Sequence, residues 1–272
     1  MGSNLAAAPA AAGVVRAFAE TVLVTLPFLA VLAVKHGWPG AAVARRAGAR
    51  VRDWVVGAPG TAALCVFLAV HSLTLAELPA EVGGEVLRTH STNLGQLAEH
   101  PVSVLVTSAL WIEIPDLPMV VLLALLVMAP VERWLGTLRA VALFFLGHVL
   151  ATVITAFALR MLLEVRPEQY QDRGLSSVVD VGVSYGSMCL AGVLCWRVRR
   201  RGPRIAVMSA LLAAVVASGA FFPDYTGFGH NTALLLGLLL GSFAARGERR
   251  RASAGQEPAA TRVPRPETAD TA

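Results

Sequence analysis

Charged side chains are scarce in this chain, and lysine is almost absent. Only 15% of the 272 residues are charged, Lys35 is the single lysine, and 56% of the residues are hydrophobic, with a mean hydropathy of +0.63. A soluble domain of this size rarely carries so much apolar surface, whereas long uncharged runs are typical of membrane-spanning helices. The composition therefore predicts an all-α polytopic membrane protein.

Cysteine is also rare. Cys65, Cys189 and Cys195 all lie inside apolar runs, where three thiols provide neither a disulfide framework nor a zinc site. We expect them to be small buried hydrophobic side chains. The sequence implies no metal and no other cofactor.

Positive charge is carried by arginines, which give the chain a formal net charge of +5. A basic balance can indicate a nucleic-acid surface. Here, however, the arginines form blocks between apolar runs, which is the pattern of cytoplasmic loops in membrane proteins. We therefore expect the lipid bilayer as a partner and no nucleic acid.

Six apolar runs are predicted to cross the membrane. They lie at 58–78, 117–131, 140–163, 181–196, 205–222 and 227–245. Arginine blocks at their ends alternate with acidic loops, so both flanks of the six spans are predicted to be cytoplasmic in a plasma membrane protein. This divides the chain into an N-terminal segment with a basic block, a six-helix membrane domain and a disordered cytoplasmic tail, at residues 1–54, 55–246 and 247–272.

An earlier apolar stretch at 18–34 is harder to assign. Its uncharged part, Thr21 to Val34, has only 14 residues and contains Pro27, whereas a full crossing needs about 20 residues. The sequence leaves open whether this stretch adds a further membrane-spanning helix.

Ser184 and His230 each begin a predicted span, and both spans run in the same direction. A serine hydroxyl beside an imidazole is the minimal activated nucleophile, and histidine titrates near neutrality. The alternative is that the serine bonds locally within its helix and the histidine is interfacial. His71 and His148 also lie in apolar runs, so the pair alone does not establish an enzyme.

Small residues follow both side chains along their helices. Gly182, Gly186 and Gly192 belong to the first helix, and Gly237 and Gly241 belong to the second. Small residues let the backbones of two membrane helices approach closely. Close packing of these two helices is therefore plausible.

Four motifs occur together in a characteristic order. They are Pro101 to Ser108, Glu132 with Gly136, Gly182-Val183-Ser184, and His230 with Gly237 and Gly241. Over residues 55–246 this arrangement resembles the rhomboid family of intramembrane serine proteases. The resemblance implies a rhomboid-like six-helix bundle in which Ser184 attacks a scissile carbonyl and His230 is the general base. The partners would be transmembrane helices of substrate proteins.

Five positions depart from the family pattern, and Met188 and Ala233 are two of them. Tyr185 replaces the glycine after the serine, and the family's two oxyanion-binding positions fall on Asp116 and Val120. A carboxylate would oppose the developing negative charge, and loss of one oxyanion donor typically costs about 100- to 1,000-fold in rate. The oxyanion would then rely on backbone N–H groups near Ser184, with Tyr185 as an extra donor.

These departures support a second hypothesis. The chain would be a catalytically impaired rhomboid-like protein, a pseudoprotease, that binds transmembrane helices of client proteins and regulates their folding or degradation. A transporter is disfavoured, because transport sites need charged or polar groups at mid-membrane and the predicted spans carry almost none there.

Overall fold

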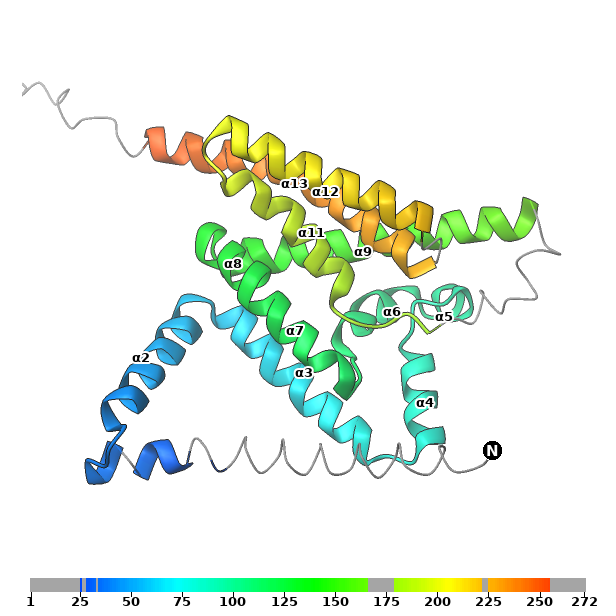
Figure 1. Cartoon of the computed structure of the whole chain (residues 1–272). Coiled ribbons are helices and arrows are strands. Elements are labelled where there is room, and N and C mark those ends of the chain that lie inside the picture. Colours follow the sequence, from blue (N-terminus) through cyan, green and yellow to red (C-terminus); the bar gives the residue numbers. More distant parts are fainter. Residues whose placement is uncertain (1–24, 26–27, 33, 166–178, 222–224, 255–272) are drawn as a thin grey trace, which may run out of the picture. The chain divides into compact units, whose positions relative to one another are not determined.

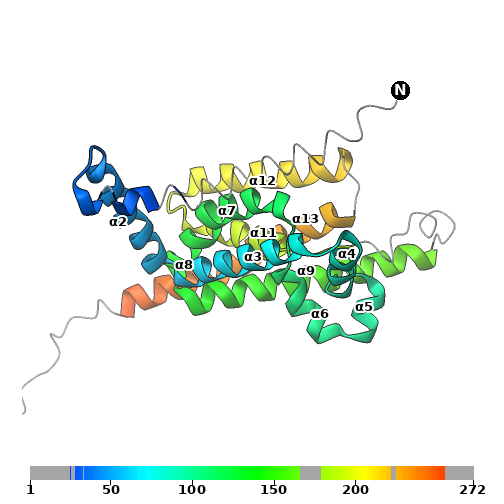
Figure 2. The ribbon, with the colours of Figure 1, turned by 90° about the horizontal axis from the view of Figure 1, so that it is seen from below.

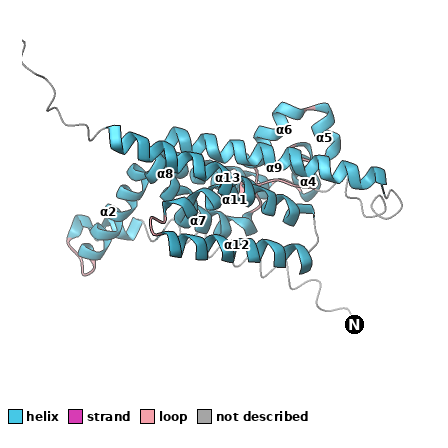
Figure 3. Cartoon of the chain, turned by 90° about the horizontal axis from the view of Figure 1, so that it is seen from above, coloured by secondary structure: helices cyan, strands magenta, loops and turns pink. Residues whose placement is uncertain are grey.

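The computed structural model describes residues 25, 28–32, 34–165, 179–221 and 225–254, and all regular structure in this part is helical (Figures 1 and 3). The chain divides into two compact units, residues 1–56 and 57–272. Helix α2 (Ala41–Gly57) forms most of the regular structure described in the first unit. The stretch at 18–34 lies largely outside the described residues, and so does the tail from residue 255.

Four helices in the described part of the second unit are long and apolar enough to span a membrane. They are Pro59–Glu77, Ile114–Leu135, Thr137–Val165 and Thr226–Glu248. Exposure of this apolar surface to water would be unfavourable, so the helices require a lipid environment. The second unit is therefore an all-helical integral membrane domain.

The second of these helices changes its winding halfway along. It begins as the 3₁₀-helix η2 (Ile114–Asp116) and α7 (Leu117–Leu123), widens into the π-helix η3 (Ala124–Met128), and continues as α8 (Ala129–Leu135). Pro130 lacks a backbone N–H, and its ring crowds the carbonyl four residues earlier. A wider turn before this proline relieves that crowding, and π-turns of this kind interrupt α-helices locally.

The connection between α3 (Pro59–Glu77) and η2 is itself helical. It contains α4 (Ala80–Thr89), α5 (Leu94–Glu99), α6 (Pro101–Thr107) and η1 (Ser108–Leu110). Helix α4 lies beside the end of α3, and α6 packs against α9 (Thr137–Val165) (Figures 1 and 2). The apolar piece Pro101–Leu110 is too short to span the membrane. The segment therefore forms a structured connection at one end of the domain.

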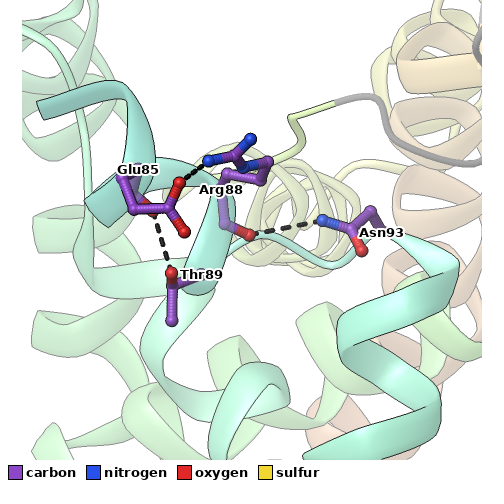
Figure 4. Close-up of polar contacts among 4 residues, drawn as sticks. All are labelled: Glu85, Arg88, Thr89 and Asn93. Atoms are coloured by element: carbon purple, nitrogen blue, oxygen red, sulfur yellow. Dashed lines mark hydrogen bonds and ion pairs between the residues drawn. The ribbon is translucent and has the colours of Figure 1, made fainter. Parts of the chain in front are cut away.

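Asn93 fixes the corner between α4 and α5. Its side chain accepts a hydrogen bond from the Gln96 N–H (2.9 Å), which is N-cap geometry, and donates one to the Arg88 carbonyl (3.3 Å) (Figure 4). An ion pair between Glu85 and Arg88 lies on the exposed side of α4. The N-cap bond satisfies an N–H at the start of α5, so the residues just before Asn93 have a defined position.

The last three helices are α11 (Ser184–Leu194), α12 (Arg201–Phe221) and α13 (Tyr225–Ala254). Helix α11 is shorter than the predicted run at 181–196, because the 3₁₀-helix η6 (Cys195–Arg197) and extended backbone at Val198 follow it. Helix α13 is longer than predicted: it continues nine residues past 245 to Ala254. The alanines and arginines after 245 are good helix formers, so the tail expected from residue 247 begins as helix.

Candidate functional site

Helices α11 and α13 pack so closely that glycine is required at their contact. A Cβ on Gly192 would lie 2.5 Å from the Leu234 carbonyl oxygen, and one on Gly237 would lie 2.7 Å from the carbonyl carbon of Cys189. Further along, a Cβ on Gly241 would lie 2.5 Å from the Trp196 ring. Residue numbers rise in the same direction along both helices, so the helices are parallel and their first residues lie at the same end.

Two other glycines of the predicted set serve α11 differently. Gly186 faces α9 (Thr137–Val165), where a Cβ would lie 2.5 Å from Phe144 Cδ2 and 2.7 Å from Phe144 Cζ. Gly182 has φ of 121° and donates its N–H to the Ser108 carbonyl (2.7 Å). Because only glycine adopts this backbone conformation readily, Gly182 makes the turn that places Ser184 at the start of α11.

His230 lies against Tyr185 in the structure. The two rings meet edge to face with centroids 5.2 Å apart, and Gly229 leaves room for the phenol, since a Cβ there would lie 2.6 Å from Tyr185 Cε1. Ser184, the first residue of α11, is half-buried. Among the described residues no hydrogen bond joins the Ser184 hydroxyl to His230. The structure thus brings the two helix starts together, and the Tyr185 ring lies against the imidazole.

Asp180 anchors this cluster from the segment before α11. Its carboxylate, 7% exposed, accepts hydrogen bonds from the Tyr185 hydroxyl (2.8 Å) and from the Thr92 hydroxyl (3.1 Å). Its backbone N–H donates to Ser91 Oγ (2.8 Å), and its carbonyl accepts from the Thr92 N–H (3.1 Å). These bonds tie the entry of α11 to the corner that Asn93 fixes.

The electrostatic setting of Asp180 favours its neutral form. Burial raises the pKa of the Asp180 carboxyl above its ordinary value, and the hydrogen bonds from Tyr185 and Thr92 and the charge of His230 lower it only in part. Sequence reasoning missed this residue and assigned it to an acidic loop. The available signal was its place four residues before Ser184.

Tyr185 has one hydroxyl proton, and it is donated to Asp180. From the sequence we expect this hydroxyl to be a hydrogen-bond donor to an oxyanion, whereas in the structure it donates to the Asp180 carboxylate. The first N–H groups of a helix have no intrahelical acceptor and carry partial positive charge. The start of α11 therefore presents backbone donors beside Ser184.

The two altered oxyanion positions differ in environment. Asp116 is the exposed last residue of η2, and Val120 is buried in α7. A buried valine offers no hydrogen-bond donor. An ionised Asp116 carboxylate also has no hydrogen-bond donor, so neither side chain would stabilise an oxyanion.

A second serine and histidine lie close to Tyr185. Ser108 Oγ is 3.0 Å from His148 Nε2, and the two residues are 0% and 3% exposed. The His148 and Tyr185 ring centroids are 6.1 Å apart. In the described part of the chain His148 Nδ1 has no hydrogen-bond partner. Sequence reasoning did not pair these residues, which are 40 positions apart.

Glu132, from the motif that ends at Gly136, holds three helices together. Its carboxylate accepts hydrogen bonds from the Gly60 N–H (2.8 Å), the Thr61 N–H (2.7 Å), the Thr61 hydroxyl (2.6 Å) and the Thr137 hydroxyl (2.7 Å). Thr61 lies at the start of α3 and Thr137 at the start of α9. Glu132 therefore satisfies the start of α3 from within the membrane domain, where an unsatisfied N–H is costly.

Among the described residues, no group of three or more histidine, cysteine, aspartate or glutamate side chains could hold a metal ion. The cluster around the starts of α11 and α13 contains two serine hydroxyls, two imidazoles, a phenol and a carboxyl, from Ser184, Ser108, His230, His148, Tyr185 and Asp180. Its chemistry is that of proton transfer and nucleophilic attack.

Comparisons with known proteins give a family and no individual relative. A search of curated proteins found no match, and a search of solved structures found no match. The sequence model of the family described as "Rhomboid-like protein" matches residues 53–249, which is more than half of the chain and includes every residue of the cluster. The chain therefore belongs to the family of rhomboid-like proteins.

Proposed function

We propose that the chain is an intramembrane serine endopeptidase that cleaves transmembrane segments, with Ser184 as nucleophile and His230 as general base. The observation that carries the proposal is the parallel packing of α11 and α13 on Gly192, Gly237 and Gly241. This packing puts the first turns of the two helices at the same end of the domain. Family membership supports the same class of function.

The proposed reaction begins when His230 takes the proton of the Ser184 hydroxyl. The serine oxygen attacks the scissile carbonyl, and the negative charge on the carbonyl oxygen is stabilised by backbone N–H groups in the first turn of α11. His230 then returns its proton to the leaving amine, and the acyl-enzyme forms. Water attacks the acyl-enzyme with His230 again as base, which releases the second product.

The reaction needs direct contact between the Ser184 hydroxyl and the His230 imidazole. Ser184 and His230 must come within about 2.6–3.2 Å, and such contacts are often looser before substrate binds. The Tyr185 ring is the group beside His230. A substrate segment that enters between the starts of α11 and α13 would therefore change the setting of Tyr185 as well.

We also propose how the helices are arranged in the membrane. Residues 55–246 would form a six-helix bundle in the plasma membrane, in which α11 and α12 join the four helices of span length. The arginine-rich ends of the helices would be cytoplasmic. Water would then reach Ser184 from the outer face.

One observation favours a second candidate, a non-catalytic protein that binds transmembrane helices. The Tyr185 hydroxyl is donated to Asp180 and not to an oxyanion, and Val120 offers no oxyanion donor. In this reading the cluster is a structural network, and client helices bind without being cut.

Labelling with a fluorophosphonate distinguishes the two candidates. The full-length protein in detergent would be treated beside Ser184→Ala and His230→Ala, with Ser187→Ala as the matched control on α11. The Ser187 hydroxyl bonds within its own helix, to the Val183 carbonyl (2.7 Å). Labelling that Ser184→Ala and His230→Ala abolish and Ser187→Ala retains supports the protease. A folded wild-type protein that takes no label favours the second candidate.

A further inference from the structure

A pocket of about 800 Å³ lies at the opposite end of α11 from Ser184. Its walls come from the last turn of α8, from η6 and the residue pair after it, and from the later part of α13. The lining residues are Arg133, Trp134, Trp196, Arg197, Arg199, Ala245 and Glu248. All belong to the second unit, and none belongs to the Ser184 cluster.

The charge of this pocket is positive. Its three arginines are exposed, and its single acid, Glu248, forms an ion pair with Arg139. The guanidinium of Arg204 lies 4.9 Å from the Trp196 ring centroid and brings a further positive charge to that wall. Arg197 and Arg199 therefore present guanidinium groups to an anion in the pocket, and guanidinium groups bind phosphate in a two-pronged geometry.

The aromatic wall is built into the fold. Trp196 donates its indole N–H to the Leu238 carbonyl (2.8 Å) and lies where Gly241 leaves space for its ring. Arg197 reaches the Pro130 carbonyl (3.5 Å). These contacts join η6 to α8 and α13, so the position of the Trp196 ring is fixed by the fold and costs little to order on binding.

The position of the pocket, at the ends of two helices of span length, indicates which kind of anion it binds. Two helices of span length, Ile114–Leu135 and Thr226–Glu248, end beside it. Tryptophan and arginine at the end of a span mark the membrane–water interface, which is the level of lipid headgroups. A phospholipid in the surrounding bilayer meets the pocket with its phosphate at the same height as the arginines.

We propose that this pocket binds the headgroup of an anionic phospholipid. Arg197 and Arg199 hold the phosphate, and Trp134 and Trp196 contact the glycerol and the first part of the acyl chains. The bound lipid joins α8, η6 and α13 at the end of the domain remote from Ser184. This site is independent of the proposed peptidase reaction.

Native mass spectrometry of the full-length protein in detergent tests the site. The protein is titrated with dioleoylphosphatidylglycerol, with dioleoylphosphatidylcholine and with inorganic phosphate. We expect one tightly retained phosphatidylglycerol, which phosphatidylcholine and millimolar phosphate do not replace. The double variant Arg197→Gln with Arg199→Gln should bind phosphatidylglycerol about tenfold more weakly, because charge-assisted hydrogen bonds are lost.

The control is Arg246→Gln, which removes one positive charge in the later part of α13, the helix that carries Ala245 and Glu248 of the pocket. The Arg246 guanidinium lies 5.5 Å from the Phe243 ring, and the residue does not line the pocket. This control should bind as the wild type does, and Arg199→Lys, which keeps the charge but loses the two-pronged geometry, should bind more weakly than the wild type and more tightly than the double variant. Melting curves verify that each variant is folded.

Three results would overturn the proposal. Equal retention of phosphatidylglycerol and phosphatidylcholine would remove the headgroup preference. An equal loss in Arg246→Gln would assign the effect to general surface charge. Displacement of the lipid by inorganic phosphate would make this a site for soluble anions instead.

Discussion

The Tyr185 hydroxyl donates a 2.8 Å hydrogen bond to Oδ2 of Asp180, five residues earlier in the chain. The ring of the same tyrosine lies edge to face with His230. One side chain thus connects a buried carboxyl to the histidine that we propose as general base. The position of His230 depends on the segment before α11 as well as on α13.

Removal of the Tyr185 hydroxyl should destabilise the fold while the aromatic ring keeps its position. In Tyr185→Phe, the ring contact with His230 remains, but the buried Asp180 carboxyl loses one donor. We expect the free energy of unfolding to fall by about 1–3 kcal/mol, measured by denaturant unfolding in detergent micelles. Thr232→Val is the control, because the Thr232 hydroxyl bonds only to the Phe228 carbonyl of its own helix (2.9 Å). Equal effects of the two substitutions would contradict the role given to Tyr185.

The Asp180 carboxyl should make stability depend on pH. Because burial raises its pKa above the ordinary value of 3.8, the folded chain holds the proton more tightly than the unfolded chain does. Its contribution to stability is complete below 3.8 and is lost as pH rises through the raised folded pKa. Asp180→Asn cannot ionise, so its melting temperature should lack this decline, whereas the exposed Asp116→Asn should follow the wild-type curve. A decline of equal size in Asp180→Asn would refute the assignment.

The contact between α11 and α13 should tolerate no side chain at Gly237. In Gly237→Ala, the new methyl group meets the backbone of Cys189, so the two helices must separate. Overpacking of this kind costs about 1–3 kcal/mol or more, and fluorophosphonate labelling of Ser184 should fall with it. Gly247→Ala on the same helix is the control. Among the described residues outside its own stretch of helix, no atom lies within 4 Å of its added methyl group, so stability should be unchanged or rise by up to about 1 kcal/mol.

Much of the helical architecture could be predicted, because membrane spans are local in sequence. A run of apolar residues of sufficient length indicates a helix by itself, and the runs at 58–78 and 140–163 correspond closely to α3 and α9. Helix α13 continues past the predicted end of its span at 245. The charges after 245 indicate where the membrane ends, but a helix can continue beyond the membrane.

The candidate site could be predicted only in part, for a physical reason. A serine or histidine at a helix start is visible in the sequence, but its neighbours come from distant segments. The bonds from Thr92 to Asp180 join residues 88 positions apart, and no local pattern encodes them. Pro130 can be read from the sequence, but the sequence does not show that a π-helix relieves the crowding between its ring and the carbonyl four residues earlier.

The pair of Ser108 and His148 gives the sharpest test of which serine reacts. Both residues are buried, and Ser108 Oγ is the hydrogen-bond partner of His148 Nε2 (3.0 Å). In Ser108→Ala this bond is lost inside the protein, so we expect the free energy of unfolding to fall by about 1–3 kcal/mol. Fluorophosphonate labelling of the folded variant should persist, because Ser184 is untouched. Ser103→Ala, at an exposed position of α6, should change neither quantity. If folded Ser108→Ala takes no label while Ser184→Ala still does, the nucleophile is Ser108 and the proposed role of Ser184 is wrong.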